Sequence, residues 1–98
     1  MTSISRTITT AILDWRGLLI RVTFERQRYI AHIQVETLEP IRAPLPITET
    51  GYKSSFIANE VIDDAGGPEA FVETWLDDAA QTRGWIEQEA EIRQYALL

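Results

Sequence analysis

The sequence contains no cysteine and only one histidine, His32. Without cysteine the chain has no disulfide, no thiolate nucleophile and no zinc site built from cysteines. With one histidine it has neither a His-rich metal site nor a catalytic arrangement that needs two histidines. These absences argue against several enzyme classes, and we expect a protein with no catalytic residues, no bound metal and no cofactor.

Long hydrophobic runs are also missing. No apolar run approaches the roughly 20 residues that a membrane-spanning helix needs. The first residues, Met1–Arg6, are polar and lack the apolar stretch of a signal peptide. We therefore expect a cytoplasmic protein that does not bind membranes. A length of 98 residues suits a single domain over residues 1–98.

Basic residues are scarce in the second half of the chain. Residues 51–98 hold three bases and ten acids, for a balance of −7, whereas residues 1–50 hold six arginines and five acids, for +1; together these give the net charge of −6. Such a balance disfavours direct binding to nucleic-acid phosphates. It favours docking on a protein partner with a basic surface. The alternative is an acidic helical face that only keeps the protein in solution.

Hydrophobic and polar residues alternate in the first third of the chain, which indicates a β-meander. The alternating segments are Thr7–Leu13, Leu18–Glu25 and Tyr29–Thr37, and a type I turn is expected at Asp14–Gly17. Alternation of period two is typical of an antiparallel sheet with one face in water. It places Ile33 and Val35 on the inner face, and it places Arg21, His32 and Glu36 on the outer face. A short fourth strand is expected at Tyr52–Ile57.

Apolar residues recur at helical spacing in the last third. We expect a helical turn at Glu60–Ala65 capped by Asn59, a helix that begins at Pro68, and a last helix at about Arg83–Ala96 capped by Thr82. The predicted fold class is α+β: a small antiparallel sheet of three or four strands, followed by two C-terminal helices packed on one face. The expected buried positions on the helices are Phe71, Val72, Trp75, Leu76, Ala79, Trp85, Ile86, Ala90, Ile92 and Leu97.

The segment Arg42–Ser55, with the sequence RAPLPITETGYKSS, is the most distinctive part of the chain. Its prolines impose an extended path, and functional residues often lie on loops that a rigid scaffold holds. The segment matches no nucleotide-binding, metal-binding or nucleophile signature. Its polar side chains either contact a partner or hydrogen-bond the backbone of the loop itself.

Trp15 lies in the expected turn, where a large aromatic residue either anchors a partner or folds over the end of the sheet. The acidic stripe of the Pro68 helix is a further candidate surface. The candidate partner-binding residues are therefore Trp15, Arg42, Thr48, Glu49, Tyr52, Lys53, Glu69, Glu73 and Asp77.

Across its middle the sequence resembles a family of small bacterial proteins of the accessory type carried by plasmids and phages. The shared features are an A-P-L-P-I-T-E-T-G-Y-[KR]-S segment at Ala43–Ser54, a Trp-Arg-Gly turn at Trp15–Gly17, and a W-L-D helix at Trp75–Asp77. The resemblance implies no particular activity. In its small size, its acidity and its lack of a catalytic set, the chain is also similar in type to anti-CRISPR inhibitors from mobile elements.

We therefore expect a non-enzymatic acidic interaction protein, an anti-CRISPR-like inhibitor or modulator of a nucleic-acid-handling host complex. One alternative is a small enzyme or small-molecule-binding domain that uses the loop, with Glu49, Tyr52 and Lys53 and also His32. Another is a homodimeric structural protein that pairs through an exposed strand edge. A cleft that holds the three loop residues together would favour the enzyme, and a convex acidic surface would favour the interaction protein.

Overall fold

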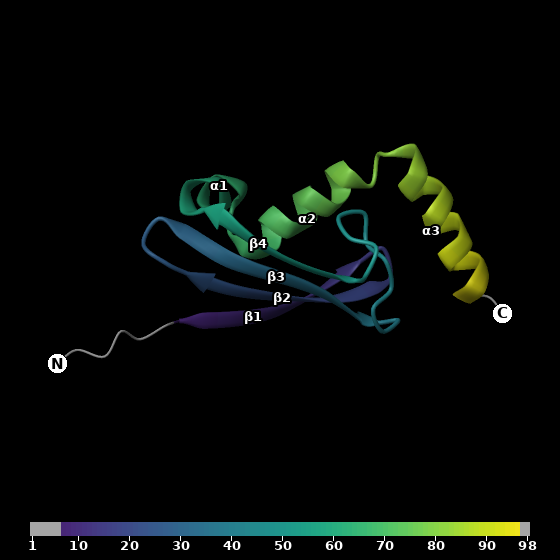
Figure 1. The fold of residues 1–98 in the computed structure, drawn as a ribbon, viewed down its shortest axis with the longest axis horizontal. Coiled ribbons are helices and arrows are strands. Elements are labelled where there is room, and N and C mark those ends of the chain that lie inside the picture. The colour runs from purple at the N-terminus through teal and green to yellow at the C-terminus, as the bar shows by residue number, and fades with distance from the viewer. Residues whose placement is uncertain (1–6, 97–98) are drawn as a thin grey trace.

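A computed structural model of the chain describes residues 7–96. It confirms the expected α+β class, because a four-stranded antiparallel sheet is followed by helices (Figure 1). The strands pair in chain order, so each lies beside its neighbour in the sequence. They are β1 (Ile8–Trp15), β2 (Leu18–Arg26), β3 (Ile30–Glu39) and β4 (Tyr52–Ala58).

Two residues, Arg16 and Gly17, connect β1 to β2, and Trp15 pairs directly with Leu18. Both connecting residues have positive φ, 51° and 84°, as a type I′ hairpin turn requires. The prediction of a type I turn was therefore wrong, because the type I′ turn matches the right-handed twist of the two strands. As a consequence Trp15 is the last residue of β1 and lies outside the turn.

Helices α1 (Asn59–Ala65) and α2 (Pro68–Ala79) cover one face of the sheet, and α3 (Arg83–Ala96) extends beyond its end (Figure 1). Among the residues that the structure describes, no helix is long and apolar enough to cross a membrane. Thr82 caps α3 as expected, since its hydroxyl accepts the Trp85 backbone N–H at 3.4 Å.

Asn59 does not cap α1, which corrects the prediction made from its position. Its side-chain amide instead donates to the backbone carbonyls of Gln27, at 2.9 Å, and Arg28, at 3.2 Å. Because Asn59 is buried, these bonds give its amide nitrogen two acceptors away from water and tie the start of α1 to the β2–β3 turn.

The core lies between the inner face of the sheet and helices α1 and α2. Leu76 is fully buried, as expected, and Phe71 packs half-buried against the core. Trp75 lies at the rim, half-buried and beside Phe71 at 5.7 Å between ring centroids, while Val72 takes the central position. The largest fully buried side chains are Ile20, Val22, Ile33, Val35, Thr37, Ile62, Val72 and Leu76.

Helix α3 joins this core through one of its faces. Trp85 is buried and Ile92 packs half-buried against the core, as predicted. Ile86 and Ala90 are exposed, contrary to the prediction, because α3 extends past the sheet and has only one face to cover. The predicted burial of Leu97 falls outside the described residues.

Candidate functional site

Trp15 is part of the core, with 4% of its surface exposed. Its ring packs against Trp85 with 6.0 Å between centroids, and the Arg16 guanidinium lies 4.7 Å above it. Its indole N–H donates to the Asp77 carboxylate at 2.9 Å. Trp15 therefore folds over the end of the sheet and is not an exposed anchor. Asp77 is exposed, but its carboxylate is already hydrogen-bonded within the chain.

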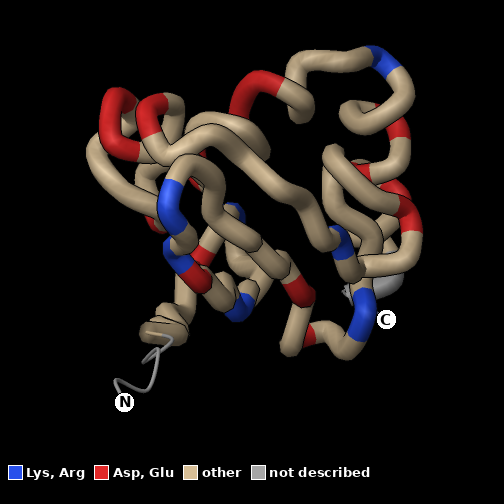
Figure 2. The backbone as a smooth tube through the Cα atoms, turned by 60° about the vertical axis from the view of Figure 1, so that its left-hand side comes forward, with Lys and Arg blue, Asp and Glu red and all other residues tan. Residues whose placement is uncertain are grey.

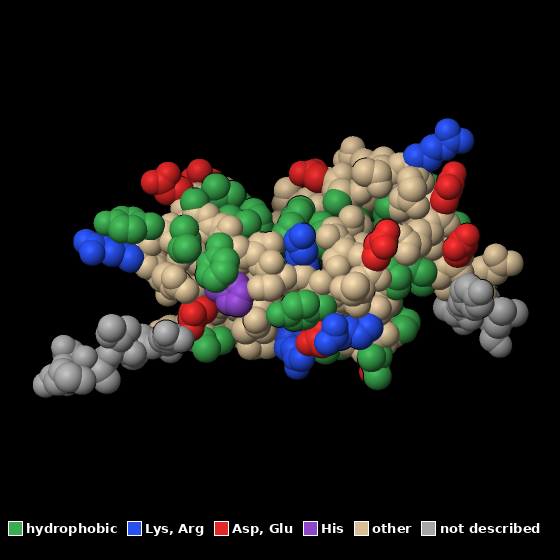
Figure 3. Space-filling view, in the orientation of Figure 1, with side chains coloured by type: hydrophobic (Ala, Val, Ile, Leu, Met, Phe, Trp, Pro, Cys, Tyr) green, Lys and Arg blue, Asp and Glu red, His purple; other side chains and the backbone are tan. Residues whose placement is uncertain are grey.

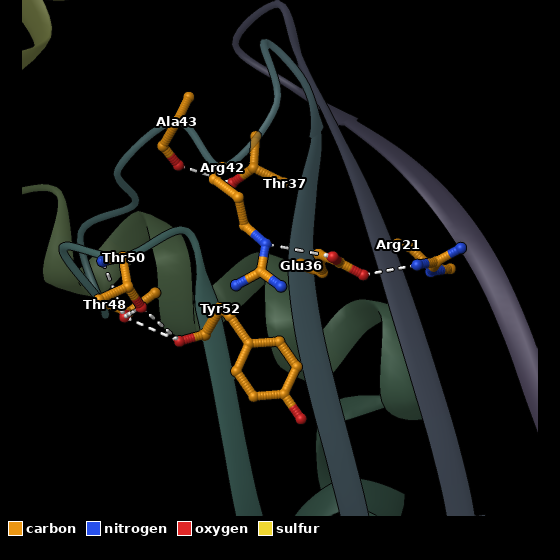
Figure 4. A network of polar contacts seen from close by, with 8 residues as sticks. All are labelled: Arg21, Glu36, Thr37, Arg42, Ala43, Thr48, Thr50 and Tyr52. Atoms are coloured by element: carbon orange, nitrogen blue, oxygen red, sulfur yellow. Dashed lines mark hydrogen bonds and ion pairs between the residues drawn. The ribbon is translucent and has the colours of Figure 1, made fainter.

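The Arg42–Ser55 loop is held by its own hydrogen bonds (Figure 4). Leu45 and Thr48 exchange backbone hydrogen bonds at 2.8 and 3.0 Å. The hydroxyl groups of Thr48 and Thr50 both donate to the backbone carbonyl of Tyr52, at 2.8 and 3.2 Å. Of the two roles left open for the polar side chains of the loop, hydrogen bonding to the loop backbone is observed for Thr48 and Thr50, whereas Glu49 is exposed.

The base of the loop is fastened to the end of β3. The buried Thr37 donates its hydroxyl to the Ala43 carbonyl at 2.8 Å and its N–H to the Gly51 carbonyl at 2.9 Å. Gly51 has a φ of +73°, and a Cβ there would lie 2.5 Å from the carbonyl carbon of Arg42. Only glycine fits this close backbone approach without a shift of the chain.

The face of the sheet that turns away from the helices, here called the open face, carries a polar network. Arg21, Glu36 and Tyr52 lie in one row across β2, β3 and β4. The Glu36 carboxylate pairs with Arg21 on one side and with the Arg42 Nε on the other, at 3.3 Å in the second case. The Arg42 guanidinium also lies 5.4 Å above the Tyr52 ring (Figure 4).

A depression of about 320 Å³ lies over this network. That volume is at the lower end of the range for small-molecule sites, and the depression is open to solvent. Its lining can hydrogen-bond a polar group, and its one guanidinium group, that of Arg21, is already paired with Glu36. The lining residues are Thr10, Arg21, Thr23, Gln34, Glu36 and Tyr52.

The three loop residues of the enzyme hypothesis lie on different surfaces. Tyr52 and Lys53 are adjacent on β4, so their side chains point to opposite faces of the sheet. Tyr52 is opposite Glu36 on the open face, and Lys53 is opposite the buried Val35. Glu49 lines a separate depression of about 490 Å³ between the loop and α3.

His32 lies on the open face, as the alternation predicts. Its ring stacks on Phe56 with 4.7 Å between centroids and 16° between planes, and its Nε2 is hydrogen-bonded to the Ser54 hydroxyl. Figure 3 shows this single histidine at the surface among hydrophobic side chains. His32 lies opposite Glu25 in the β2–β3 register and takes no part in the Arg21–Glu36–Arg42 network.

Helices α1 and α2 are uniformly acidic. Together they carry seven acids and no base, and Figure 2 marks the acidic positions along them. Asp63 pairs with Arg26 of β2 and Asp77 accepts the Trp15 indole. All seven carboxylates are exposed, and the five that have neither of these contacts are here called the acidic helix surface: Glu60, Asp64, Glu69, Glu73 and Asp78.

The Arg26–Asp63 pair links the sheet to α1 through two contacts, at 2.8 and 3.0 Å. The hydrogen bonds from Arg26 lower the pKa of Asp63 below its ordinary value, and the same bonds raise the pKa of Arg26. Within residues 7–96, no three histidine, aspartate or glutamate side chains are grouped so that they could hold a metal ion.

A family model described as the KlcB third domain matches residues 8–85 of the chain. The chain belongs to this family. The matched region runs from the start of β1 to Trp85 on α3, so the sheet, the loop and the acidic helix surface all lie inside the KlcB third-domain region. Searches among curated proteins and among solved structures found no match.

The sequence-based candidates omitted two residues of the open-face network, Arg21 and Glu36. Alternation had placed both side chains outward on neighbouring strands. The register that makes them direct partners follows from the bulge between Leu19 and Ile20 and from the length of the β2–β3 turn. A predicted register would have been the signal that identified the pair.

Proposed function

We propose that this domain is a non-enzymatic protein-interaction module that docks through its acidic helix surface on a basic surface of a partner. The observation that carries the proposal is the segregation of charge: residues 59–79 hold seven acids and no base, all seven acids are exposed, and five of them are engaged by neither Arg26 nor Trp15. A surface of one sign steers an oppositely charged partner and orients it on approach.

The arrangement of the loop supports an interaction module over a small enzyme. Glu49, Tyr52 and Lys53 face different surroundings, so they offer no common site for a base, a hydroxyl and a cation to act on one substrate. The loop hydroxyls instead bond the loop backbone.

Membership of a family named after KlcB supports a plasmid-associated setting. We propose, more specifically, an inhibitor or modulator of anti-CRISPR type that acts in the cytoplasm on a nucleic-acid-handling host complex. Such complexes present basic grooves to phosphate groups. The acidic helix surface would occupy a groove of this kind, while the domain itself would not bind nucleic acid.

The proposal places docking on the helices alone, and the arrangement of the candidate residues supports this choice. Arg42 and Tyr52 lie on the open face, whereas Glu69 and Glu73 lie on α2, on the other side of the sheet. A single partner surface does not contact both sides of the sheet at once. The proposal therefore assigns docking to Glu69 and Glu73 and leaves Asp77 in its bond to Trp15.

The test is a comparative capture from lysate of the native host, read by mass spectrometry at low and moderate salt. The bait is the wild-type chain, the α2 variant Glu69→Lys/Glu73→Lys, or the α3 control Glu87→Lys/Glu91→Lys. Both variants change the charge equally, and all four positions are exposed. We expect a protein that the wild type and the α3 control retain at low salt, and that the α2 variant loses.

Capture of the same proteins by all three baits would contradict the proposal. So would tight binding of duplex DNA by the isolated chain at physiological salt, because the charge argument excludes it.

A further inference from the structure

Among residues 7–96, strand β1 forms one edge of the sheet, with β2 on its only paired side. Its residues Ile8 and Ile12 are 58% and 55% exposed. Residues 8–13 contain neither a charged residue nor a proline, and these are two of the features by which natural proteins block an edge. The other edge strand, β4, carries Lys53 and continues directly into α1.

The β1–β2 turn determines which backbone groups of β1 point outward. In a two-residue hairpin the pair that flanks the turn, Trp15 and Leu18, is hydrogen-bonded. Because hydrogen-bonded pairs alternate along an antiparallel ladder, residues 9, 11, 13 and 15 direct their N–H and C=O groups to β2. Residues 8, 10, 12 and 14 therefore present theirs to the outside.

This edge is self-complementary. If two copies of β1 pair antiparallel about a two-fold axis at Thr10, Ile8 of each copy lies opposite Ile12 of the other, and the two Thr10 residues face each other. All three positions present outward N–H and C=O groups, and all three side chains lie on the open face. Moving the axis to Ala11 would instead set Ile8 against Asp14.

The charged residues of β2 that neighbour Ile8 and Ile12 do not oppose the pairing of two β1 strands. In the β1–β2 register Ile8 lies opposite Glu25, and Ile12 lies opposite Arg21. A cross-strand row of the dimer therefore runs from Glu25 on β2 of one copy, through the paired β1 strands, to Arg21 on β2 of the second copy. The two ends of this row are three strand spacings, or about 14 Å, apart. No like charges face each other in these rows.

We infer that β1 pairs with β1 of a second copy of this chain about a two-fold axis at Thr10. The product is a dimer with one continuous sheet, in which each subunit contributes four strands. The pairing uses neither Glu69 nor Glu73, so it is independent of the proposed docking on a basic partner.

The test measures the molar mass of the full chain by light scattering over a range of concentrations. We expect a reversible dimer whose dissociation constant changes little with salt, since residues 8–13 are uncharged. Thr10→Lys sets two ammonium groups opposite each other and should weaken the dimer by about fivefold or more. Ser54→Lys is the matched control, because Ser54 lies in the same cross-strand row on the far edge.

The absence of native cysteine allows a second measurement. Thr10→Cys should form a disulfide-linked dimer under mild oxidation, because directly opposite residues in a sheet lie within the Cα separation that a disulfide accepts. Ser54→Cys should remain largely monomeric. A wild-type chain that is monomeric at every concentration would overturn the inference. A dimer unaffected by Thr10→Lys, or equal cross-linking of the two cysteine variants, would also overturn it.

Discussion

The hydrogen bond between Trp15 and Asp77 decides which acids of α2 are available to a partner. The indole N–H of Trp15 donates to the Asp77 carboxylate at 2.9 Å, and this bond is partly buried. A hydrogen bond to a charged acceptor contributes about 1.5–3 kcal/mol, and partial exposure places this one near 1.5 kcal/mol. Asp77→Ala should therefore lower the free energy of unfolding by about that amount.

Urea unfolding followed by tryptophan fluorescence measures the change. Small domains lose about 1 kcal/mol of stability per molar urea, so the midpoint should fall by about 1.5 M. Glu73→Ala is the matched control on the same helix, because Glu73 is exposed, and its effect should stay within about 0.5 kcal/mol.

A double-mutant cycle isolates the bond itself. Phenylalanine lacks the indole N–H, so in a Trp15→Phe background Asp77→Ala should cost only about 0.5 kcal/mol. Equal midpoints for Asp77→Ala and Glu73→Ala in the wild-type background would refute the reasoning. Asp77 would then rejoin the docking candidates.

Three further substitutions test the loop and the link between β2 and α1. Gly51→Ala should lower stability by about 2 kcal/mol or more in urea unfolding, since its Cβ would lie 2.5 Å from the Arg42 backbone at a φ of +73°. Thr37→Val should cost about 1–3 kcal/mol in the same assay, because it leaves a buried carbonyl without its donor at 2.8 Å; an unchanged midpoint would count against the bond. Asp63→Asn should destabilise the domain at neutral pH. Because Arg26 lowers the pKa of Asp63 from its ordinary value of 3.8, the stability difference from wild type should vanish as the pH falls through that lowered pKa. A difference that stays constant into acid would exclude the ion pair as its cause.

Local patterns in the sequence predicted the sheet well. Alternation of period two assigned Ile33 and Val35 to the inner face and His32 to the open face, and the structure agrees at each position. Such alternation depends only on neighbouring residues and on burial of one face. The same rule separates Tyr52 from Lys53, although the hypothesis of a common site was formed without applying it.

The misassigned residues depend on interactions between distant parts of the chain. Trp15 was assigned to a turn because the Asp14–Gly17 composition fits type I, but the strand pairing extends to Trp15 and the indole meets Asp77, 62 residues away. Asn59 precedes a helix as a cap does, yet its amide bonds the β2–β3 turn. Local spacing reveals neither the hydrogen-bond acceptor of Trp15 nor the acceptors of Asn59.

The apolar stripe predicted on α2 identified the buried side of the helix but not every residue that is buried there. The stripe included Val72, Trp75 and Leu76, and only Val72 and Leu76 are fully buried. Periodicity defines which side of a helix faces the core, while the position of its axis over the sheet decides which residue is central. That position follows from the tertiary packing of α1 and α2.

The most direct measurement of the central claim is the association rate of the captured partner with the immobilised domain as a function of ionic strength. For the wild type we predict a rate that falls steeply with salt, because a surface of one sign steers the encounter. Glu69→Lys/Glu73→Lys should slow association at low salt by about tenfold and flatten the salt dependence, with an unchanged unfolding midpoint. Glu87→Lys/Glu91→Lys should behave like the wild type. Equal rates and equal salt dependence for all three chains would contradict docking through the acidic helix surface.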